Sequence, residues 1–257
     1  MWLIIFISIF VAVTVSWIFL LLQNGKEFKR LDEKVAVIVA HPDDECLFFA
    51  PTIVKLISAG KDVHIFCLSN GIIYIYLFYQ GNYEGLGMRR EQEFKRSCQA
   101  LGIQDENIVL NMEDIFKDNP SLTWSPTLVG EHVKNLIEIR KIKSVISFDD
   151  YGVSGHLNHI SVFHGLNQLK RSNWDLKIYK LHSVPLWRKY LGVFDVPLTF
   201  YSQKWKTVTF TLSPYEVYRK GFYAMKMHSS QLVWFRFLFL ISSRYMITNT
   251  LTEIELR

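Results

Sequence analysis

The sequence predicts an α/β fold, a doubly wound and mostly parallel sheet preceded by a transmembrane helix. Short apolar runs rich in β-branched residues alternate with amphipathic segments of helical spacing along most of the 257-residue chain. Two of these runs end abruptly in clusters of charged and polar residues. The chain also begins with a long uncharged stretch, which favours a membrane anchor ahead of one α/β domain.

Residues 1–22 carry no charge and are almost all apolar, and ~20 residues of helix are enough to cross a bilayer. A cleaved signal peptide is the less favoured alternative, because the stretch lacks a positive start and a small-residue cleavage site. Positive charges follow the span, at Lys26, Lys29 and Arg30, so we expect the rest of the chain on the cytoplasmic side. The predicted units are an anchor over 1–23, a linker over 24–34 and one α/β domain over 35–257.

The first half of the domain alternates strand and helix. The apolar run 35–40 predicts the first strand, and the helical spacing of 47–58 predicts a helix that Gly60 ends. A second apolar strand is expected over 63–68. The amphipathic segment 89–101, with Gly102 as its stop, predicts the next helix, followed by a short strand over 107–110.

The second half repeats the alternation after a proline-containing loop. The expected elements in chain order are a helix over 128–139, a strand over 143–148, a helix over 156–169, a strand over 177–183, a strand over 207–212 and a helix over 213–228. An aromatic segment over 232–241 is too short to span a bilayer and contains Arg236. It is read either as a buried terminal element or as a contact with a membrane surface.

One apolar stretch, Ile72 to Tyr79, fits neither pattern. It is compatible with an extra strand or a membrane-touching loop. Its composition also resembles translated A/T-rich non-coding sequence, and we therefore include the hypothesis of a retained intron remnant or gene-model error.

Charge and cysteine content narrow the function classes. The net charge of +5 is mild and suits an anionic membrane surface or an anionic substrate. The basic residues form no dense run, so we predict no nucleic-acid partner. Cys46, Cys67 and Cys98 are odd in number and have no CxxC spacing, which argues against a disulfide framework or a zinc knuckle and favours a reducing compartment.

The most informative cluster is His41-Pro42-Asp43-Asp44-Glu45, directly after the first strand. Unpaired buried carboxylates are costly, so this density of charge is not explained by a core. Open α/β sheets bind ligands beyond the carboxyl ends of their strands. The cluster therefore predicts a metal site at that edge.

A second cluster runs from Asp149 to His159 after the strand 143–148, and it should reach the same edge. Catalytic zinc takes three protein ligands and keeps a position for a nucleophilic water. We assign His41, Asp44 and His159 as ligands, Asp43 as general base, and His156 as the acid or oxyanion partner. Glu45 is read as a helix N-terminal charge or a group supporting the ligands. The remaining histidines are expected to be structural: His64, His132, His164, His182 and His228.

Together, Ala40-His41-Pro42-Asp43-Asp44-Glu45 and Gly155-His156-Leu157-Asn158-His159 resemble the LmbE-type zinc deacetylases. The resemblance covers roughly residues 34–257. The segments Arg90-x-x-Glu93 and His228-Ser229-Ser230-Gln231 resemble the branch acting on GlcNAc-phosphatidylinositol. This sequence departs from the family in the second motif at two positions. Leu157 stands where proline is frequent, and Ser154 stands where bacterial relatives have tyrosine.

The resemblance implies a Rossmann-like fold, an anchor in the endoplasmic reticulum membrane and a cytosolic catalytic domain. It implies a membrane-embedded glycolipid substrate, removal of its N-acetyl group, and Arg90 as a substrate contact. Zinc is the expected cofactor, although other divalent transition metals suit the same ligands. Two alternatives stay open: an LmbE-type hydrolase of another N-acetylated sugar conjugate, and an inactive membrane-bound variant.

Overall fold

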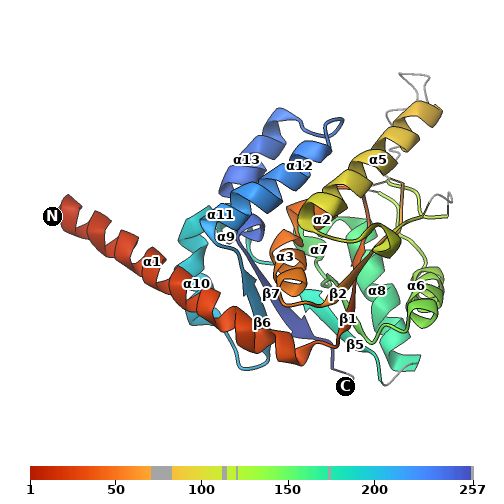
Figure 1. Cartoon of the computed structure of the whole chain (residues 1–257), viewed down its shortest axis with the longest axis horizontal. Helices are drawn as coiled ribbons and strands as arrows, with labels where there is room; N and C mark the ends of the chain where they lie inside the picture. Colours follow the sequence, from red (N-terminus) through yellow and green to blue (C-terminus); the bar gives the residue numbers. More distant parts are fainter. Residues whose placement is uncertain (71–82, 112–114, 120, 173–174, 256–257) are drawn as a thin grey trace.

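The computed structural model describes residues 1–70, 83–111, 115–119, 121–172 and 175–255 (Figure 1). The side chains of residues 83–87 are also left undescribed. The block Ile72–Tyr79 lies outside the described residues, so the hypotheses about it stay predictions.

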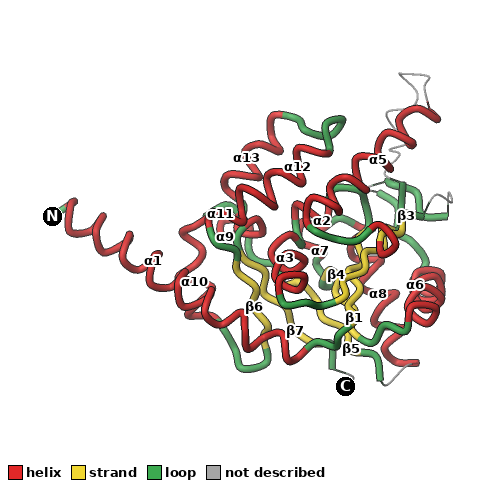
Figure 2. The backbone as a smooth tube through the Cα atoms, viewed as in Figure 1, coloured by secondary structure: helices red, strands yellow, loops and turns green. Residues whose placement is uncertain are grey.

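A seven-stranded sheet forms the centre of the domain, in the order β3-β2-β1-β4-β5-β7-β6 (Figure 2). The first five strands in this order are parallel, whereas β7 is antiparallel to both β5 and β6. The predicted doubly wound and mostly parallel sheet is therefore confirmed. The strands are β1 (Lys34–Val39), β2 (Asp62–Cys67), β3 (Ile108–Leu110), β4 (Ser144–Phe148), β5 (Lys177–Leu181), β6 (Thr207–Thr211) and β7 (Thr248–Glu253).

Helices cover both faces of this sheet, as Figure 1 shows. Helices α6 (Pro126–Arg140) and α8 (Leu157–Ser172) pack together on one face. Helices α3 (Ala50–Ser58), α5 (Tyr83–Leu101) and α12 (Tyr223–Met227) lie together over the other. The shorter helices are α2 (Asp44–Leu47), α7 (Gly152–Gly155), α9 (Leu186–Lys189), α10 (Asp195–Ser202), α11 (Pro214–Glu216) and α13 (Trp234–Ser242).

Several regions differ from the sequence prediction, among them 186–202, where α9 and α10 were not predicted. The helix expected over 47–58 begins earlier and breaks at Phe48, giving α2 and α3. The helix expected over 213–228 contains a wider π-helical turn at 217–222, between α11 and α12. Strand β7 was not predicted, because its sequence Thr-Asn-Thr-Leu-Thr-Glu is mostly polar. Its Asn249 is nevertheless buried, where its side chain bonds to Phe48 and Thr52.

The strands that lead to the polar clusters form the most deeply buried part of the core. Residues 35–39 of β1 have no exposed surface, and every residue of β4 is buried. Both strands are covered on two faces, which explains why they read as continuous apolar runs rather than as alternating ones. The polar turns that follow them are therefore held on a rigid base.

Helix α1 (Trp2–Glu27) extends from the domain and is long and apolar enough to cross a membrane (Figure 1). Its C-terminal half packs against the sheet edge, where Ser16, Leu20 and Asn24 form one buried face. The Asn24 amide donates to the carbonyl of Thr211 at 2.9 Å and accepts from its N–H at 3.0 Å. Trp17 Nε1 also donates to the carbonyl of Leu212 at 2.7 Å, so side chains of the helix occupy the free edge at the end of β6.

The aromatic segment forms α13, an exposed helix. Leu240 is its one buried residue, whereas Trp234, Phe235, Leu238 and Ile241 are exposed. The interpretation of this segment as a buried terminal element does not hold for most of its side chains. Its apolar residues face outward, as a membrane-surface contact requires.

Candidate metal centre

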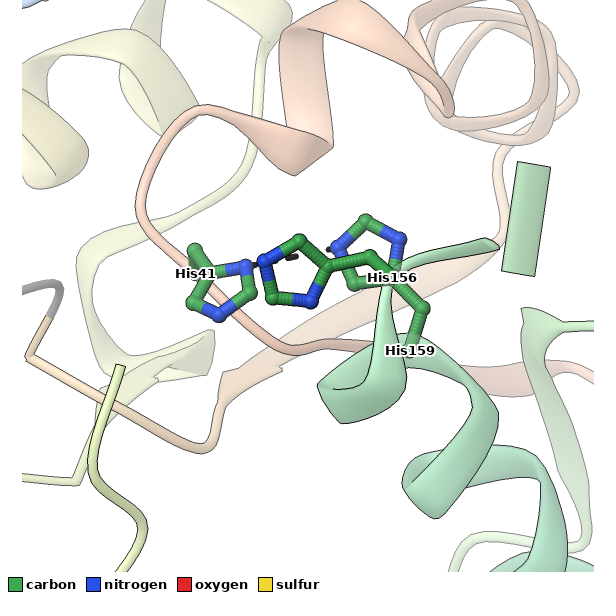
Figure 3. A group of neighbouring side chains, drawn as sticks. All are labelled: His41, His156 and His159. Atoms are coloured by element: carbon green, nitrogen blue, oxygen red, sulfur yellow. Dashed lines mark hydrogen bonds between the residues drawn. The ribbon is translucent and has the colours of Figure 1, made fainter. Parts of the chain in front are cut away.

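Two turns meet at the carboxyl edge of the sheet because β1 and β4 are parallel neighbours. The first turn, residues 41–45, follows β1, and the second, residues 149–156, follows β4. His41 comes from the first turn, while His156 and His159 come from the second turn and the start of α8 (Figure 3). Ligand atoms of these three histidines lie within 4.8 Å of one another.

The predicted ligands His41, Asp44 and His159 form a compact set. His159 Nε2 lies 3.3 Å from His41 Nδ1 and 3.4 Å from Asp44 Oδ1. The other Asp44 oxygen is 3.7 Å from His41 Nδ1. Ligands bound tetrahedrally at 2.0–2.1 Å are separated by ~3.3–3.4 Å, so these three side chains fit a zinc-sized ion.

In each of the two histidine ligands, the ring nitrogen that points away from the common centre (the far nitrogen) has a hydrogen-bond partner. His159 Nδ1 donates to the carbonyl of Gly152 at 3.0 Å. His41 Nε2 lies 3.0 Å from Asn158 Oδ1 and 3.3 Å from Asp118 Oδ1. These acceptors place the proton on the far nitrogen, which leaves His41 Nδ1 and His159 Nε2 with lone pairs toward the common centre.

Asp44 is buried and held as an anion. Its Oδ2 accepts the backbone N–H groups of Ala40 and His41 at 3.0 and 2.8 Å. Burial opposes ionisation, but the imidazoles of His159 and His41 outweigh it and lower the pKa of Asp44 to about 2. The carboxylate thus carries the negative charge that a cation requires.

His156 lies beside the ligands but its hydrogen bonding differs from theirs. Its ring is 4.7 Å from that of His41 and 4.8 Å from that of His159. Its Nδ1 accepts the backbone N–H of Asn158 at 3.2 Å, which leaves the proton on Nε2. Burial and the neighbouring imidazoles lower the pKa of His156 to about 3, so the ring is a neutral hydrogen-bond donor.

Asp43, the predicted base, lies in a left-handed backbone conformation with φ of 114°. Its backbone N–H donates to Glu45 Oε2 at 2.9 Å, which stabilises this conformation. Its carboxylate is buried and forms an ion pair with Arg236 of α13. Nothing in the sequence pairs Arg236 with the HPDDE segment.

Glu45 acts as a support for this turn, in agreement with its predicted role. Its Oε1 accepts from Ser97 Oγ at 2.5 Å and from His228 Nε2 at 2.6 Å, and all three side chains are buried. Gln231 adds a hydrogen bond from its amide to the carbonyl of Pro42 at 3.2 Å. His228 was predicted to be structural, and the structure places it in the hydrogen-bond network beneath the predicted base.

Cys46 lies beside Glu45 and His228 within ligand distance. Burial and the Glu45 charge raise the pKa of its thiol, however. The Glu45 oxygen of this group already accepts hydrogen bonds from Ser97 and His228, so we interpret the group as a buried brace of the turn.

Arg90, expected as a substrate contact, lies within α5 and near Asp118. Its Nε is buried without a hydrogen-bond partner, and burial lowers its pKa while the charge of Asp118 opposes this. Asp118 in turn contacts His41. Sequence analysis missed Asp118, because it comes from an irregular loop and belongs to neither motif.

Gly152 is required where the second turn meets α8. Its φ is +63°, and a Cβ there would lie 2.7 Å from the Cβ of His159. Only glycine allows the backbone to approach this ligand so closely. The glycine thereby places its own carbonyl against His159 Nδ1.

Comparison with known proteins agrees with this geometry. The family model described as PIG-L, GlcNAc-PI de-N-acetylase, matches residues 36–170. A Dictyostelium discoideum protein named as a probable N-acetylglucosaminyl-phosphatidylinositol de-N-acetylase is 35% identical, with 91% of this chain and 98% of that protein covered. The Bos taurus protein named as N-acetylglucosaminyl-phosphatidylinositol de-N-acetylase is 34% identical, with 85% and 82% covered.

The solved structure of N,N'-diacetylchitobiose deacetylase from Pyrococcus horikoshii has the same fold, with a TM-score of 0.57 and 17% identity. The alignment covers 86% of this chain and 84% of that one. Given the two matched motifs, the relatives that cover most of the sequence and the shared fold, the chain belongs to the PIG-L family of GlcNAc-PI de-N-acetylases.

Proposed function

We propose that this chain is a metal-dependent amide hydrolase that removes the N-acetyl group from GlcNAc-phosphatidylinositol, the second step of GPI-anchor biosynthesis. The observation that carries the proposal is the ligand set His41, Asp44 and His159, with separations of 3.3–3.7 Å, beside Asp43 and His156. The names of its relatives supply the substrate class.

Zinc is the proposed metal, and another divalent transition metal would suit the same nitrogen and oxygen ligands. When bound, the metal would lower the pKa of a ligated water and so supply the nucleophile for amide hydrolysis. His41, Asp44 and His159 would hold it. Their outer partners, above all Asn158 and Gly152, keep the two imidazoles in the required orientation.

Asp43 is the proposed general base, which accepts the proton of the attacking water. His156 is neutral with its proton on Nε2, so of its two predicted roles we propose the oxyanion one, a hydrogen bond to the oxygen of the tetrahedral intermediate. The proton that Asp43 takes from the water balances the one that the departing glucosamine nitrogen takes up. Arg90, whose Nε lacks a partner, is proposed as a substrate contact.

The proposed location is the endoplasmic reticulum membrane, with residues 1–23 as a single-pass anchor, 24–34 as a linker and 35–257 as a cytosolic deacetylase domain. The apolar exposed surface of α1 and the positive charges after it support this orientation. A two-chain glycolipid substrate stays in the bilayer, so an anchor keeps enzyme and substrate in the same plane. We propose no nucleic-acid partner.

The test is release of free amine from GlcNAc-phosphatidylinositol by the purified full chain, before and after chelation and after zinc is restored. We expect zinc-dependent release, and a loss of about 10²- to 10⁴-fold in Asp43→Asn because a general base is removed. Asp175→Asn, an exposed aspartate that pairs with Lys143, is the matched control and should keep full activity. A zinc-loaded, folded protein that releases no amine would refute the proposed substrate.

A further inference from the structure

A groove of about 640 Å³ lies next to the metal centre, between α2, α9 and α13. Its walls are largely apolar and aromatic, and include Leu47, Phe48, Tyr190, Trp234 and Phe239. Two cations, Lys189 and Arg236, also line it. Cations on apolar walls are unusual enough to require a physical reason.

Lys189 is buried, with 6% of its surface exposed. Among the residues that the structure describes, no carboxylate forms an ion pair with it. Its ammonium group instead lies 5.7–5.9 Å from the ring centres of Phe48, Tyr190 and Phe239. Burial lowers its pKa, which shows that the surroundings do not compensate its charge. An anion in the groove would supply the missing partner.

Arg236 connects the groove to the metal centre. It projects from α13 toward Asp43, while other residues of the same helix, Phe235 and Leu238, are exposed. Burial lowers the pKa of Arg236 to about 10, so its guanidinium stays charged near neutral pH. One end of the groove therefore begins at the proposed base.

Phe48 forms the wall between the groove and the ligands. Its ring centre is 5.9 Å from that of His159 and 5.9 Å from Lys189 Nζ. The His159 ring and Lys189 Nζ therefore lie within about 12 Å of each other, a span that two linked sugar-sized rings can cover. In the proposed substrate, the acetamide and the phosphodiester are separated by the glucosamine and inositol rings.

We infer that this groove binds the phosphodiester and the adjoining glycerolipid of the substrate, with Lys189 and Arg236 as the residues that recognise the phosphate. The inference rests on the proposed function and specifies which side chains select a phospholipid-linked sugar. Lys189, which has no carboxylate partner among the described residues, matches the phosphate, and Arg236 adds positive charge that it shares with Asp43. The apolar walls match the glycerol and the first carbons of the acyl chains.

The position of the groove fits a substrate that stays in a bilayer. Helix α13 contacts residues 192–194, which connect α9 to α10, and α10 packs against α1 (Figure 1). The exposed side chains Trp234 and Ile241 continue the apolar lining outward. Acyl chains that leave the groove would therefore emerge beside the predicted membrane helix.

The decisive experiment compares two substrates in Lys189→Met, a variant that removes the charge and keeps the length. GlcNAc-phosphatidylinositol contains the phosphate, whereas GlcNAc-inositol lacks phosphate and lipid. We expect kcat/KM to fall about 10- to 100-fold for the phospholipid, the size of a lost charge-assisted hydrogen bond, and to stay unchanged for GlcNAc-inositol. Lys134→Gln, an exposed lysine on α6, is the control. An equal loss on both substrates would overturn the inference.

A binding measurement separates this inference from the proposed reaction. The probe is dioctanoyl phosphatidylinositol, titrated into the full chain in detergent, with dioctanoylglycerol as the phosphate-free comparison. Lys189→Met and Arg236→Gln should each weaken phosphatidylinositol binding about tenfold or more, Arg236→Lys should restore part of it, and Arg171→Gln should have no effect.

Charge-dependent binding without deacetylation would support the groove and refute the proposed function. Deacetylation without charge-dependent binding would support the proposed function and refute the inference about the groove.

Discussion

The two turns that form the metal centre follow adjacent parallel strands, yet they are braced in different ways. In the second turn, Asp149 accepts hydrogen bonds from the N–H groups of Tyr151 and Gly152, and both N–H and Oγ of Ser183 complete the set. This turn is closed by its own carboxylate and by the end of the neighbouring strand.

The first turn depends on distant parts of the chain. Glu45 holds the backbone of Asp43, but Glu45 itself is positioned by Ser97 on α5 and by His228 after α12. Gln231 holds Pro42 from the same C-terminal segment. The segment 228–236 thus acts on the predicted base, Asp43, in two ways. His228 positions Glu45, which holds the Asp43 backbone, and Arg236 forms an ion pair with the Asp43 carboxylate.

The difference shows that the ligands from the second turn are organised locally, whereas the base and its neighbouring ligand need the C-terminal segment in place. The backbone of Asp43, with φ of 114°, is an unfavourable conformation for a non-glycine residue. The contacts of Glu45 with Ser97 and His228, which we call the long-range brace, form only in the complete fold. They hold the Asp43 backbone in this conformation.

The largest effect should come from removing a ligand from either turn. His41→Ala and His159→Ala should each weaken zinc binding more than a hundredfold, because loss of an outer partner alone costs 10–100-fold. Metal content by atomic spectroscopy and competition titration measure this. His164→Ala, an exposed histidine on the same helix as His159, is the control. If either variant keeps its zinc, the ligands of one turn are sufficient to bind the metal and the prediction is wrong.

Removal of the long-range brace should have the next largest effect. His228→Ala removes one of the two side-chain donors to the buried carboxylate of Glu45 and leaves only Ser97, so we expect the free energy of unfolding to fall by about 2–3 kcal/mol. Denaturant titration in detergent measures it. His228→Gln keeps a donor for Glu45 and should lose less. A loss below about 1 kcal/mol in the alanine variant would contradict the long-range brace.

The corresponding change in the second turn should be milder. Ser183→Ala removes the hydroxyl that donates to Asp149 and accepts from the N–H of Val153, while the Ser183 backbone bond to Asp149 remains. We expect a loss of about 1–2 kcal/mol in the same titration. If this variant is destabilised more than His228→Ala, the proposed ranking of the two braces is reversed.

The smallest expected effect is a pH-dependent change in stability from Glu93, whose carboxylate accepts hydrogen bonds from Ser229 and Ser230 in the segment 228–231. Burial raises the pKa of Glu93, but hydrogen bonds from Ser230 and Ser229 and the bond from Arg89 outweigh it, so the net pKa is lowered. The native state therefore favours the ionised form. Its contribution is fully present above the unfolded pKa and is lost as pH falls through the lower folded value.

Glu93→Gln, which lacks this titration, should be less stable than the wild type at pH 7, by less than about 1.5 kcal/mol, the range of a single hydrogen bond. This difference in stability should narrow as the pH falls below 4.5, the ordinary pKa of a glutamate side chain. A gap that stays constant between pH 7 and pH 3 would show that the Glu93 charge contributes nothing.

The parallel core was predictable from the sequence, and so was the meeting of the proposed ligands at one edge, because the signals for both are local. An apolar strand followed at once by His41, Asp43 and Asp44 contains both the element and the site within one short segment. The supporting contacts were not predictable in the same way. Asp118 reaches His41 from an irregular loop, and Arg236 reaches Asp43 across almost the whole length of the chain.

Strand β7 shows the same limit in the fold. Its Thr248 and Asn249 read as loop residues, but both are buried because Thr211, Thr52 and the carbonyl of Phe48 provide partners. Polar residues become strand residues here only through contacts that the linear sequence does not display. The His228-Ser229-Ser230-Gln231 segment was the one available signal for the long-range brace.

The paired hydrogen bonds between Asn24 and Thr211 have a mechanical consequence. Because they join the membrane helix directly to the sheet, α1 is no loose tether. If α1 spans the bilayer, this junction sets the height of the metal centre above the lipid surface. Asn24→Leu would loosen that junction and make the height variable. Turnover of a substrate whose reacting amide projects a fixed distance from the bilayer would then become sensitive to bilayer thickness.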